Sequence, residues 1–378
     1  MRNFEYNKCR CCGSHELTKW FSLPDSPVAN ALYDEPNKDR YPLTLNFCKN
    51  CSHLQLDSAP NPNGVFSTYR YKSGVSNFFI KHFAEYAETI FEAKKPKTVL
   101  EIGSNDGYLL EQFKKLGCEV YGVEPSIYLR EDHEKRGVPV ITDFFSNRVI
   151  VENRWEEKFD VVCANNVLAH IPDTLGVLLD IVNSLKPGGV LVAECNDQLG
   201  IFDGTCLDNV YHEHIDYYSP HSFATLLQRV GLVVETIDYI SSHGKSFRTI
   251  ARKEDSKHDI IFRRIDLKAQ KKIVQNYIDQ RRRRVQESLK TRKFVAYGAA
   301  AKAVTSLYTL SLVDKNLVGV VDDNELKQGR YFPGTDILIT SPEKLNKDAV
   351  VLVTAWNVFE DIKNKLISRG HRGEIICI

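Results

Sequence analysis

The chain has 378 residues, 43% of them hydrophobic and 26% charged, so two or three domains with sizeable cores are expected. A formal net charge of +1 gives no overall attraction to nucleic acid or to a membrane surface. The amino-terminal residues lack the apolar core of a secretion signal and no apolar run could span a bilayer, which favours a cytoplasmic protein with free thiols and metal ligands over disulfides.

Five of the ten cysteines lie within the first 51 residues. Four of them form two CxxC pairs separated by thirty-five residues: Cys9 with Cys12, and Cys48 with Cys51. Two such pairs complete a tetrahedral Zn²⁺ site, and because protein fills all four positions the zinc would be structural. It would hold a small domain over residues 1–70. Cys11 leaves a second choice of ligand open, and free or redox-active thiols are the other interpretation.

A polar and aromatic segment over residues 66–77 leads into a predicted helix over Phe78–Phe91. Ser73 or Ser76 is placed to cap that helix. A helix N-terminus is a favourable place for a diphosphate, so this segment is a candidate ligand contact. Capping combined with aromatic core packing is the alternative.

The stretch Thr98–Leu110 contains a short apolar run that ends in an acid, then a glycine loop and a helix start. Gly103 and Gly107 allow the backbone to turn sharply and to approach a ligand closely. Twenty-one residues after Gly103, Glu124 ends a second apolar run, where an acid can accept both ribose hydroxyls of a nucleoside. The pattern is ExGxxxG and not GxGxxG.

The alternation of strands and helices continues after this loop. The further elements are a strand edge at Val140–Phe145, a buried strand with a polar end at Phe159–Asp173, a helix at Thr174–Leu185 and a strand at Val190–Glu194. Asp143 is placed to meet an adenine amino group. This order predicts an α/β fold with a doubly wound parallel sheet and ligands at the carboxyl ends of its strands. It resembles class I methyltransferases that use S-adenosylmethionine, here over residues 71–255.

A polar and aromatic insert, Asp208–Ser219, follows the fifth strand, and four hydrogen-bonding side chains in it are consecutive: Tyr211, His212, Glu213 and His214. In an extended stretch the two histidines would share one face and the other two residues the opposite face. In an irregular loop several of them would line one pocket. The motif is not HExxH, so it does not indicate a catalytic zinc, and a hydrogen-bonded surface loop is the alternative.

Residues 256–378 predict a linker helix followed by a second, Rossmann-like domain. The helix, Ile265–Lys290, carries four consecutive arginines at Arg281–Arg284, for which a solvated face is favoured over nucleic-acid binding. Phe294–Ala303 then has the pattern of a strand, a small-residue loop and a helix start, and Leu317–Asp323 is a strand ending in paired acids. The loop has a single glycine, so an NAD site is the weaker interpretation.

In this order of parts the chain resembles the nucleotide-sugar C-methyltransferase family over nearly its whole length. Members of that family methylate carbon 3 of 4-keto deoxysugars attached to dTDP. The segments that carry the resemblance most specifically are Cys9–Cys51, Glu101–Gly107, Asn165–His170, Tyr211–His214, His243–Arg248 and Gly298–Ala303. Lys245 and Phe247 depart from the family's HGGSLR-like element, and Cys195 follows Glu194 where a proline-containing strand exit is expected.

The resemblance implies a role for each motif. His214 would be the base that removes a proton next to the ketone, with Tyr211 and Glu213 assisting or holding the substrate, and the enolate would attack the sulfonium methyl group. The implied cofactor contacts are Glu101, Gly103, Asn105, Gly107, Glu124, Asp143, Phe144, Asn165 and His170. The implied substrate contacts are Tyr71, Ser73, His243, Arg248, Gly298 and Lys302.

The expected partner is therefore a dTDP-linked sugar, bound by a monomer that contacts neither nucleic acid nor a membrane. Three rival functions stay open on the sequence alone. The nearest is an O- or N-methyltransferase acting on a sugar. The others are a zinc-dependent nucleic-acid binder that uses the arginine run and an NAD(P)-dependent reductase that uses the loop at Gly298.

Overall fold

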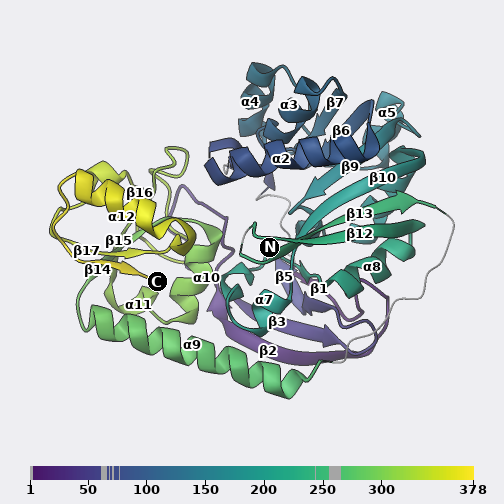
Figure 1. Ribbon diagram of the computed structural model, residues 1–378. Helices are drawn as coiled ribbons and strands as arrows, with labels where there is room; N and C mark the ends of the chain where they lie inside the picture. The colour runs from purple at the N-terminus through teal and green to yellow at the C-terminus, as the bar shows by residue number, and fades with distance from the viewer. Residues whose placement is uncertain are drawn as a thin grey trace.

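Three main sheets organise the described part of the chain: one N-terminal, one in the core and one C-terminal (Figure 1). The computed structural model describes residues 3–60, 66–67, 69, 72–75, 77–242, 244–254 and 265–378. Within these ranges the strands form a four-stranded, a seven-stranded and a five-stranded sheet, together with a two-stranded ribbon. The ribbon pairs β1 (Asn3–Glu5) with β5 (Ser58–Pro60).

The N-terminal sheet is antiparallel and has the strand order β11-β4-β3-β2. Its strands are β2 (Leu17–Ser26), β3 (Tyr41–Cys48), β4 (Leu54–Leu56) and β11 (Asp216–Tyr217). The last of these comes from the polar insert, and Asp216 pairs with Gln55. A strand from the middle of the chain therefore completes the sheet of the cysteine-rich domain.

The seven-stranded sheet of the core has the order β12-β13-β10-β9-β6-β7-β8. Its strands are β6 (Thr98–Ile102), β7 (Glu119–Val123), β8 (Val140–Ile141), β9 (Phe159–Asn165), β10 (Leu185–Asn196), β12 (Leu232–Ile240) and β13 (Ser246–Lys253). β6 to β10 are parallel, and β13 and β12 extend them in antiparallel order. The predicted doubly wound α/β core is confirmed.

Six helices accompany this sheet: α2 (Asn77–Lys94), α3 (Tyr108–Lys115), α4 (Arg130–Arg136), α5 (Asn147–Asn153), α6 (Thr174–Ser184) and α8 (Pro220–Gln228). The strand order reverses between β6, which leads to β7 and β8, and β9, which leads to β10. A ligand of a doubly wound sheet binds at the carboxyl ends of the strands beside such a reversal. Glu101 in β6 and Asn165 at the end of β9 lie there.

The C-terminal domain is a parallel sheet in the order β16-β15-β14-β17-β18. Its strands are β14 (Phe294–Tyr297), β15 (Leu317–Val321), β16 (Ile339–Thr340), β17 (Val350–Val353) and β18 (Ile375–Cys377). Its helices are α10 (Ala301–Thr309), α11 (Val313–Asn316) and α12 (Phe359–Ser368). This is the second Rossmann-like domain that the sequence predicted.

The long helix α9 (Leu267–Leu289) runs beneath both the C-terminal domain and the N-terminal sheet (Figure 1). At its start the Trp20 indole donates to the Leu267 carbonyl (3.0 Å). Further along, Arg281 donates to the Ile378 carbonyl (2.6 Å) and Arg282 to that of Thr309 (2.8 Å). Two of the four consecutive arginines thus hold α9 to the C-terminal domain.

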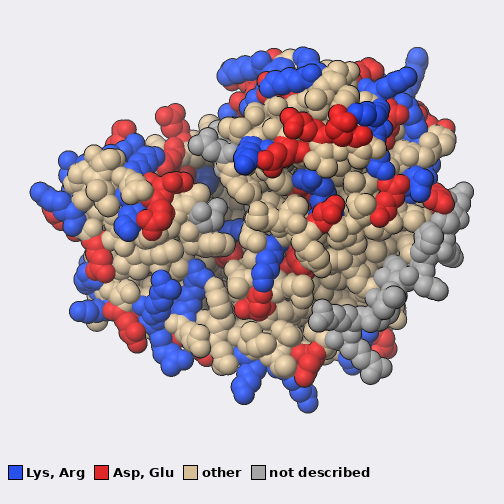
Figure 2. Space-filling model, in the orientation of Figure 1, with Lys and Arg blue, Asp and Glu red and all other residues tan. Residues whose placement is uncertain are grey.

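Acidic and basic side chains are interspersed over the face in Figure 2, which is hollowed where the C-terminal domain meets the rest of the molecule. On this face the mixed signs leave no continuous basic track for a phosphate backbone among the residues drawn in colour. In the part of the chain that the structure describes, no helix combines the length and apolarity needed to cross a bilayer.

Candidate active site

The loop between β6 and α3 presents bare backbone at the carboxyl edge of the core sheet. Gly103 and Gly107 have φ values of +64° and +73°, in the left-handed region that favours glycine. A Cβ atom added at Gly107 would lie 2.8 Å from Cδ2 of His133, and one added at Gly103 would lie 3.0 Å from Cγ2 of Val167. Neither position accepts a side chain without displacing its protein neighbour, so packing requires glycine at both, and contact of the two glycines with a cofactor stays a prediction.

Glu124 follows β7 and is buried against this loop. Its two carboxylate oxygens accept the backbone N–H groups of Asn105 (2.9 Å) and Ser126 (2.9 Å). These two bonds orient the carboxylate. Each oxygen keeps a second lone pair, so it can still accept a hydrogen bond from a ribose hydroxyl. Burial raises the pKa of Glu124 to about 7, although the two N–H bonds act in the opposite direction.

Cofactor affinity is expected to rise as the pH increases through the Glu124 pKa of about 7. Ribose hydroxyls donate to an ionised carboxylate, so binding favours the deprotonated form of Glu124. Below the pKa of about 7 the affinity should fall by up to roughly tenfold per pH unit, and above pH 8 it should be flat. Titration calorimetry with S-adenosylhomocysteine measures this. Glu124→Gln should be weak at every pH, whereas Glu119→Gln, at the exposed start of β7, should keep the wild-type profile. A wild-type affinity that does not change between pH 6 and 8 would contradict this role.

Several buried polar atoms at the strand reversal lack partners among the described residues. They are Glu101 Oε2, Asn165 Oδ1 and Asn166 Oδ1. The Asn165 amide donates to the other Glu101 oxygen (3.4 Å), and burial raises the pKa of Glu101 well above its ordinary value. Unsatisfied buried acceptors are costly unless a ligand fills them. A polar ligand with donor groups, such as the amino end of S-adenosylmethionine, fits this position.

The adenine contacts stay a prediction. Asp143 follows β8 at the same edge of the sheet, with one oxygen accepting the Phe144 N–H (2.7 Å) and the other paired with Arg148. The Phe144 ring is exposed. The Arg148 ion pair already occupies part of the Asp143 carboxylate.

The Tyr211–His214 segment is a turn and not an extended stretch. The N–H of His214 donates to the Tyr211 carbonyl (2.9 Å), so these two residues lie on the same side. The Tyr211 hydroxyl is 2.7 Å from His214 Nε2, and the two ring centroids are 4.1 Å apart. The extended alternative, which placed His212 beside His214, is therefore wrong, because a turn brings residues i and i+3 together. The alternative of an irregular loop with several residues at one pocket fits.

His170 joins this pair from the cofactor edge. It ends a short 3₁₀ helix after β9, and its ring centroid lies 4.4 Å from that of His214. Its Nδ1 donates to the Glu213 carbonyl (2.6 Å). Burial lowers the pKa of His170 to about 4, so the ring is neutral at physiological pH. The predicted cofactor contact His170 and the predicted base His214 thus form one cluster.

The two middle residues of the turn face the N-terminal domain. The Glu213 carboxylate accepts the N–H groups of Asn30 (2.6 Å) and Ala29 (3.2 Å), and His212 Nε2 lies 3.1 Å from the Pro42 carbonyl oxygen. Glu213 was predicted to assist catalysis. Its contacts give it the role of anchoring the turn, and direct assistance stays a prediction.

Two of the predicted substrate contacts have protein partners in the structure. Ser73 does not cap α2, since its hydroxyl donates to Asp106 (3.1 Å) on the cofactor loop. The Arg248 guanidinium donates to the buried Glu194 carboxylate (2.6 and 2.8 Å) and lies over the Tyr86 ring (4.1 Å). Tyr71 and His243, also predicted, lie outside the described residues.

The loop at Gly298 is closed by its own domain. The Asp322 carboxylate, at the end of β15, accepts the Ala299 N–H (2.7 Å) and pairs with Lys327 (3.2 Å). An acid in this position would bind the ribose of a dinucleotide. Like Glu124 it accepts a backbone N–H of its loop, but unlike Glu124 it is also paired with a lysine, and this ion pair weakens the reductase alternative. Lys302 Nζ lies 5.9 Å from the centroid of Trp356. Contact of Gly298 and Lys302 with a diphosphate stays a prediction.

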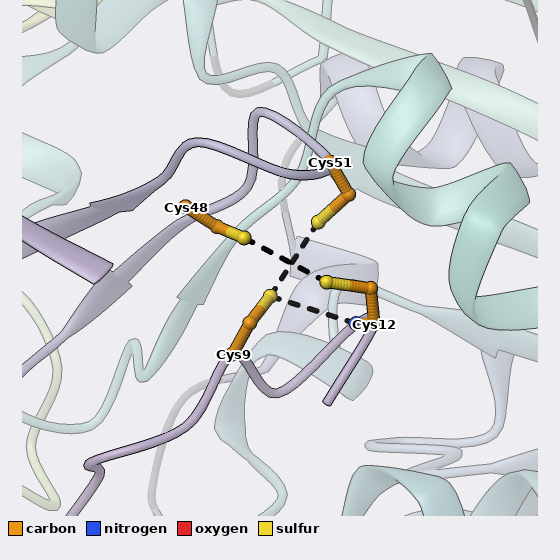
Figure 3. A group of neighbouring side chains, drawn as sticks. All are labelled: Cys9, Cys12, Cys48 and Cys51. Carbon is orange, nitrogen blue, oxygen red and sulfur yellow. Dashed lines mark hydrogen bonds between the residues drawn. The ribbon is translucent and has the colours of Figure 1, made fainter. Parts of the chain in front are cut away.

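The four predicted metal ligands converge (Figure 3). Their sulfur atoms all lie within 4.8 Å of one another, with Cys9 3.4 Å from Cys51 and Cys12 3.6 Å from Cys48. Four thiolates at the Zn–S distance of about 2.3 Å would be about 3.8 Å apart, so the arrangement fits tetrahedral Zn²⁺. Cys11 is not part of the group, which answers the choice left open by the sequence.

Sequence reasoning missed a buried polar network next to the cluster. Arg10, His53 and Asp216 form it, with His53 Nε2 and Arg10 Nε each 2.9 Å from Asp216 Oδ1. A second missed group joins His82 to Glu194 (2.9 Å). No sequence signal could have found them, because Arg10 and Asp216 are 206 positions apart and come together only in the fold.

Three family models match consecutive parts of the chain. They describe a zinc binding domain at residues 9–66, a methyltransferase domain at 75–237 and a C-methyltransferase C-terminal domain at 241–378. The C-methyltransferase NovU of Streptomyces niveus is 28% identical over 382 residues, which cover 94% of this chain and 91% of NovU. A ubiquinone biosynthesis O-methyltransferase of Paramagnetospirillum magneticum is 27% identical over 46% of this chain and 76% of its own length.

Among solved structures, the 1,6-didemethyltoxoflavin-N1-methyltransferase of Burkholderia thailandensis, with bound S-adenosylhomocysteine, matches 48% of this chain and 83% of its own at 19% identity. Its TM-score is 0.38, too low to carry an argument about the site. The three consecutive domains and the near full-length relative agree with the motifs, the sheet order and the cysteine cluster. The chain is an S-adenosylmethionine-dependent C-methyltransferase with a zinc-binding N-terminal domain, and it carries in order the three domains that the matching family models describe.

Proposed function

We propose that this enzyme methylates carbon 3 of a dTDP-linked 4-keto-deoxysugar through an enolate formed by His214. The observation that carries the proposal is the pair of His214 Nε2 and the Tyr211 hydroxyl, 2.7 Å apart, with His214 buried and Tyr211 half-buried beside His170. The same turn touches the C-terminal domain, where Thr305 donates to the Val210 carbonyl (3.0 Å). A substrate held between the core and that domain would meet both groups.

Enolate formation needs a base for the proton on carbon and a hydrogen-bond donor for the enolate oxygen, and His214 and Tyr211 suit these two roles. Carbon next to a ketone becomes nucleophilic after it loses a proton, and an imidazole is a suitable acceptor. Burial raises the pKa of Tyr211 well above its ordinary value, so the phenol keeps its proton at neutral pH. When a ketone displaces the contact between them, His214 accepts the carbon-bound proton and Tyr211 donates a hydrogen bond to the enolate oxygen. His170 is neutral and does not oppose the charge that forms on His214.

The cofactor would be held by Glu124 at the ribose and by Glu101 with Asn165 at the amino end. When bound, it supplies an electrophilic methyl group on sulfur. The buried carboxylates and the glycine loop would orient the cofactor across from His214 and Tyr211. Holding the methyl carbon in line with carbon 3 of the sugar lowers the barrier to transfer. The proposed acceptor carries dTDP, and the proposed working unit is a monomer.

A panel of dTDP- and GDP-linked ketosugars, incubated with labelled S-adenosylmethionine and analysed by mass spectrometry, tests the function. The expected product gains one methyl group on carbon, shown by NMR as loss of the carbon 3 proton signal and a new methyl signal coupled to carbon 3 and not to oxygen or nitrogen. Methylation of a hydroxyl or an amine would replace the proposal with its nearest rival.

A further inference from the structure

Arg10 lies within the zinc knuckle, between the ligands Cys9 and Cys12, and its side chain bonds to residues of the core and of the polar insert. All three guanidinium nitrogens of this largely buried residue have protein partners. Nε donates to both oxygens of Asp216 (2.9 and 3.0 Å). One terminal nitrogen donates to the Pro172 carbonyl (2.7 Å) and the other to that of Ile171 (2.7 Å).

These partners belong to the two chain segments that carry His170 and His214. Ile171 and Pro172 directly follow His170, and Asp216 lies two residues after His214. The segments also bond directly, since the Ile215 N–H donates to the Ala169 carbonyl (2.7 Å) and His170 donates to that of Glu213 (2.6 Å). Arg10 therefore bridges the two chain segments immediately beyond the two histidines.

We propose that Arg10 is a positioning residue for proton transfer, which fixes the spacing of His170 and His214 from within the zinc knuckle. The inference rests on the proposed role of His214 as the base. The Arg10 backbone is held by the flanking ligands Cys9 and Cys12, so formation of the knuckle places the guanidinium. Zinc binding is thereby linked to the geometry of a pair of residues that does not contact the metal.

The contact is suited to arginine and not to lysine. A planar guanidinium reaches a carboxylate and two carbonyl oxygens at once, whereas an ammonium group is a single point of charge. Asp216 is a strong partner for it. Burial alone would raise the pKa of Asp216, but the Arg10 charge and the His53 bond hold it below its ordinary value.

Arg10→Lys tests the proposal, with Arg229→Lys as the matched control. Arg229 donates to the Cys11 carbonyl (2.5 Å) in the same knuckle, and this contact does not involve the histidine segments. Both variants are expected to bind one zinc per chain and to keep S-adenosylhomocysteine affinity within about twofold. For Arg10→Lys, kcat should fall by roughly tenfold to a hundredfold with little change in KM, since a displacement of about 1 Å costs on that order. Arg229→Lys should stay within about twofold.

A measurement without sugar separates this inference from the proposed function. In ¹⁵N-histidine spectra, the ring N–H that His170 donates to Glu213 reports the spacing of the segments. Arg10→Lys should shift this signal and speed its exchange with solvent at least about tenfold, whereas Arg229→Lys should not. An unchanged signal with unchanged kcat would overturn the positioning role, as would a loss of zinc or cofactor binding that parallels the loss of kcat. A changed signal would support it even if no ketosugar were methylated, an outcome that would remove the proposed function alone.

Discussion

Replacing His214 with glutamine is expected to lower kcat for methyl transfer about a thousandfold, the middle of the range that a general base contributes. Glutamine keeps hydrogen-bonding capacity toward Tyr211, but it cannot accept a proton from carbon. The variant should lose two activities together: methylation with the cofactor, and exchange of the carbon 3 hydrogen with deuterated solvent without it. Cofactor affinity should be unchanged, because Glu124 and the glycine loop are held by contacts of their own with Asn105, Val167 and His133.

His212→Gln is the matched control for this experiment. His212 is two positions away and directs its Nε2 to the Pro42 carbonyl, away from the pair. Its loss should lower stability and leave both exchange and methylation within about tenfold of wild type. If His214→Gln retained hydrogen exchange while His212→Gln lost it, the base would have been assigned to the wrong histidine.

Removing zinc is expected to abolish methyl transfer while cofactor binding persists. The four thiolates would hold β2, β3 and β4 together, and the fourth strand of that sheet, β11, follows the Tyr211–His214 turn by one residue. Zinc binding in small zinc-finger peptides contributes about 10–16 kcal/mol, so loss of the metal should release the sheet. The glycine loop and Glu124 belong to the core sheet and keep their own contacts.

Cys12→Ser and chelated wild-type protein provide the measurement, with Cys377→Ser as the control at a thiol far from the cluster. Hydrogen exchange with mass spectrometry should show lost protection in β3, β4 and β11, with protection in β6 and β7 retained. Full protection of β11 and normal turnover in metal-free protein would refute the link between zinc and the turn.

Local patterns were sufficient for much of this architecture. The two CxxC pairs predicted the metal site, and the succession of apolar runs, glycines and acids predicted the core sheet with Glu101, Glu124 and Asn165 at its carboxyl edge. These predictions succeed because the chemistry of a strand end or a metal knuckle is encoded within a few neighbouring residues.

The contacts of the turn could not be predicted in this way. The sequence left both an extended stretch and an irregular loop open for Tyr211–His214, and hydrogen bonds from Asn30 and Ala29 to Glu213 hold it as a turn. The partners of Arg248 and Asp216 are set by strand pairing and by segments distant in sequence. A side chain such as Arg248 can match a family motif while its charge is neutralised by a neighbour that the motif does not include.

The most direct test of the proposal is a crystal structure with S-adenosylhomocysteine and a dTDP-linked 4-keto-deoxysugar bound together. The proposal predicts His214 Nε2 within about 3.5 Å of carbon 3, the Tyr211 hydroxyl at the ketone oxygen and the cofactor sulfur on the opposite side of that carbon. A complex in which the His214 ring faces away from the sugar, with another group in reach of carbon 3, would contradict it.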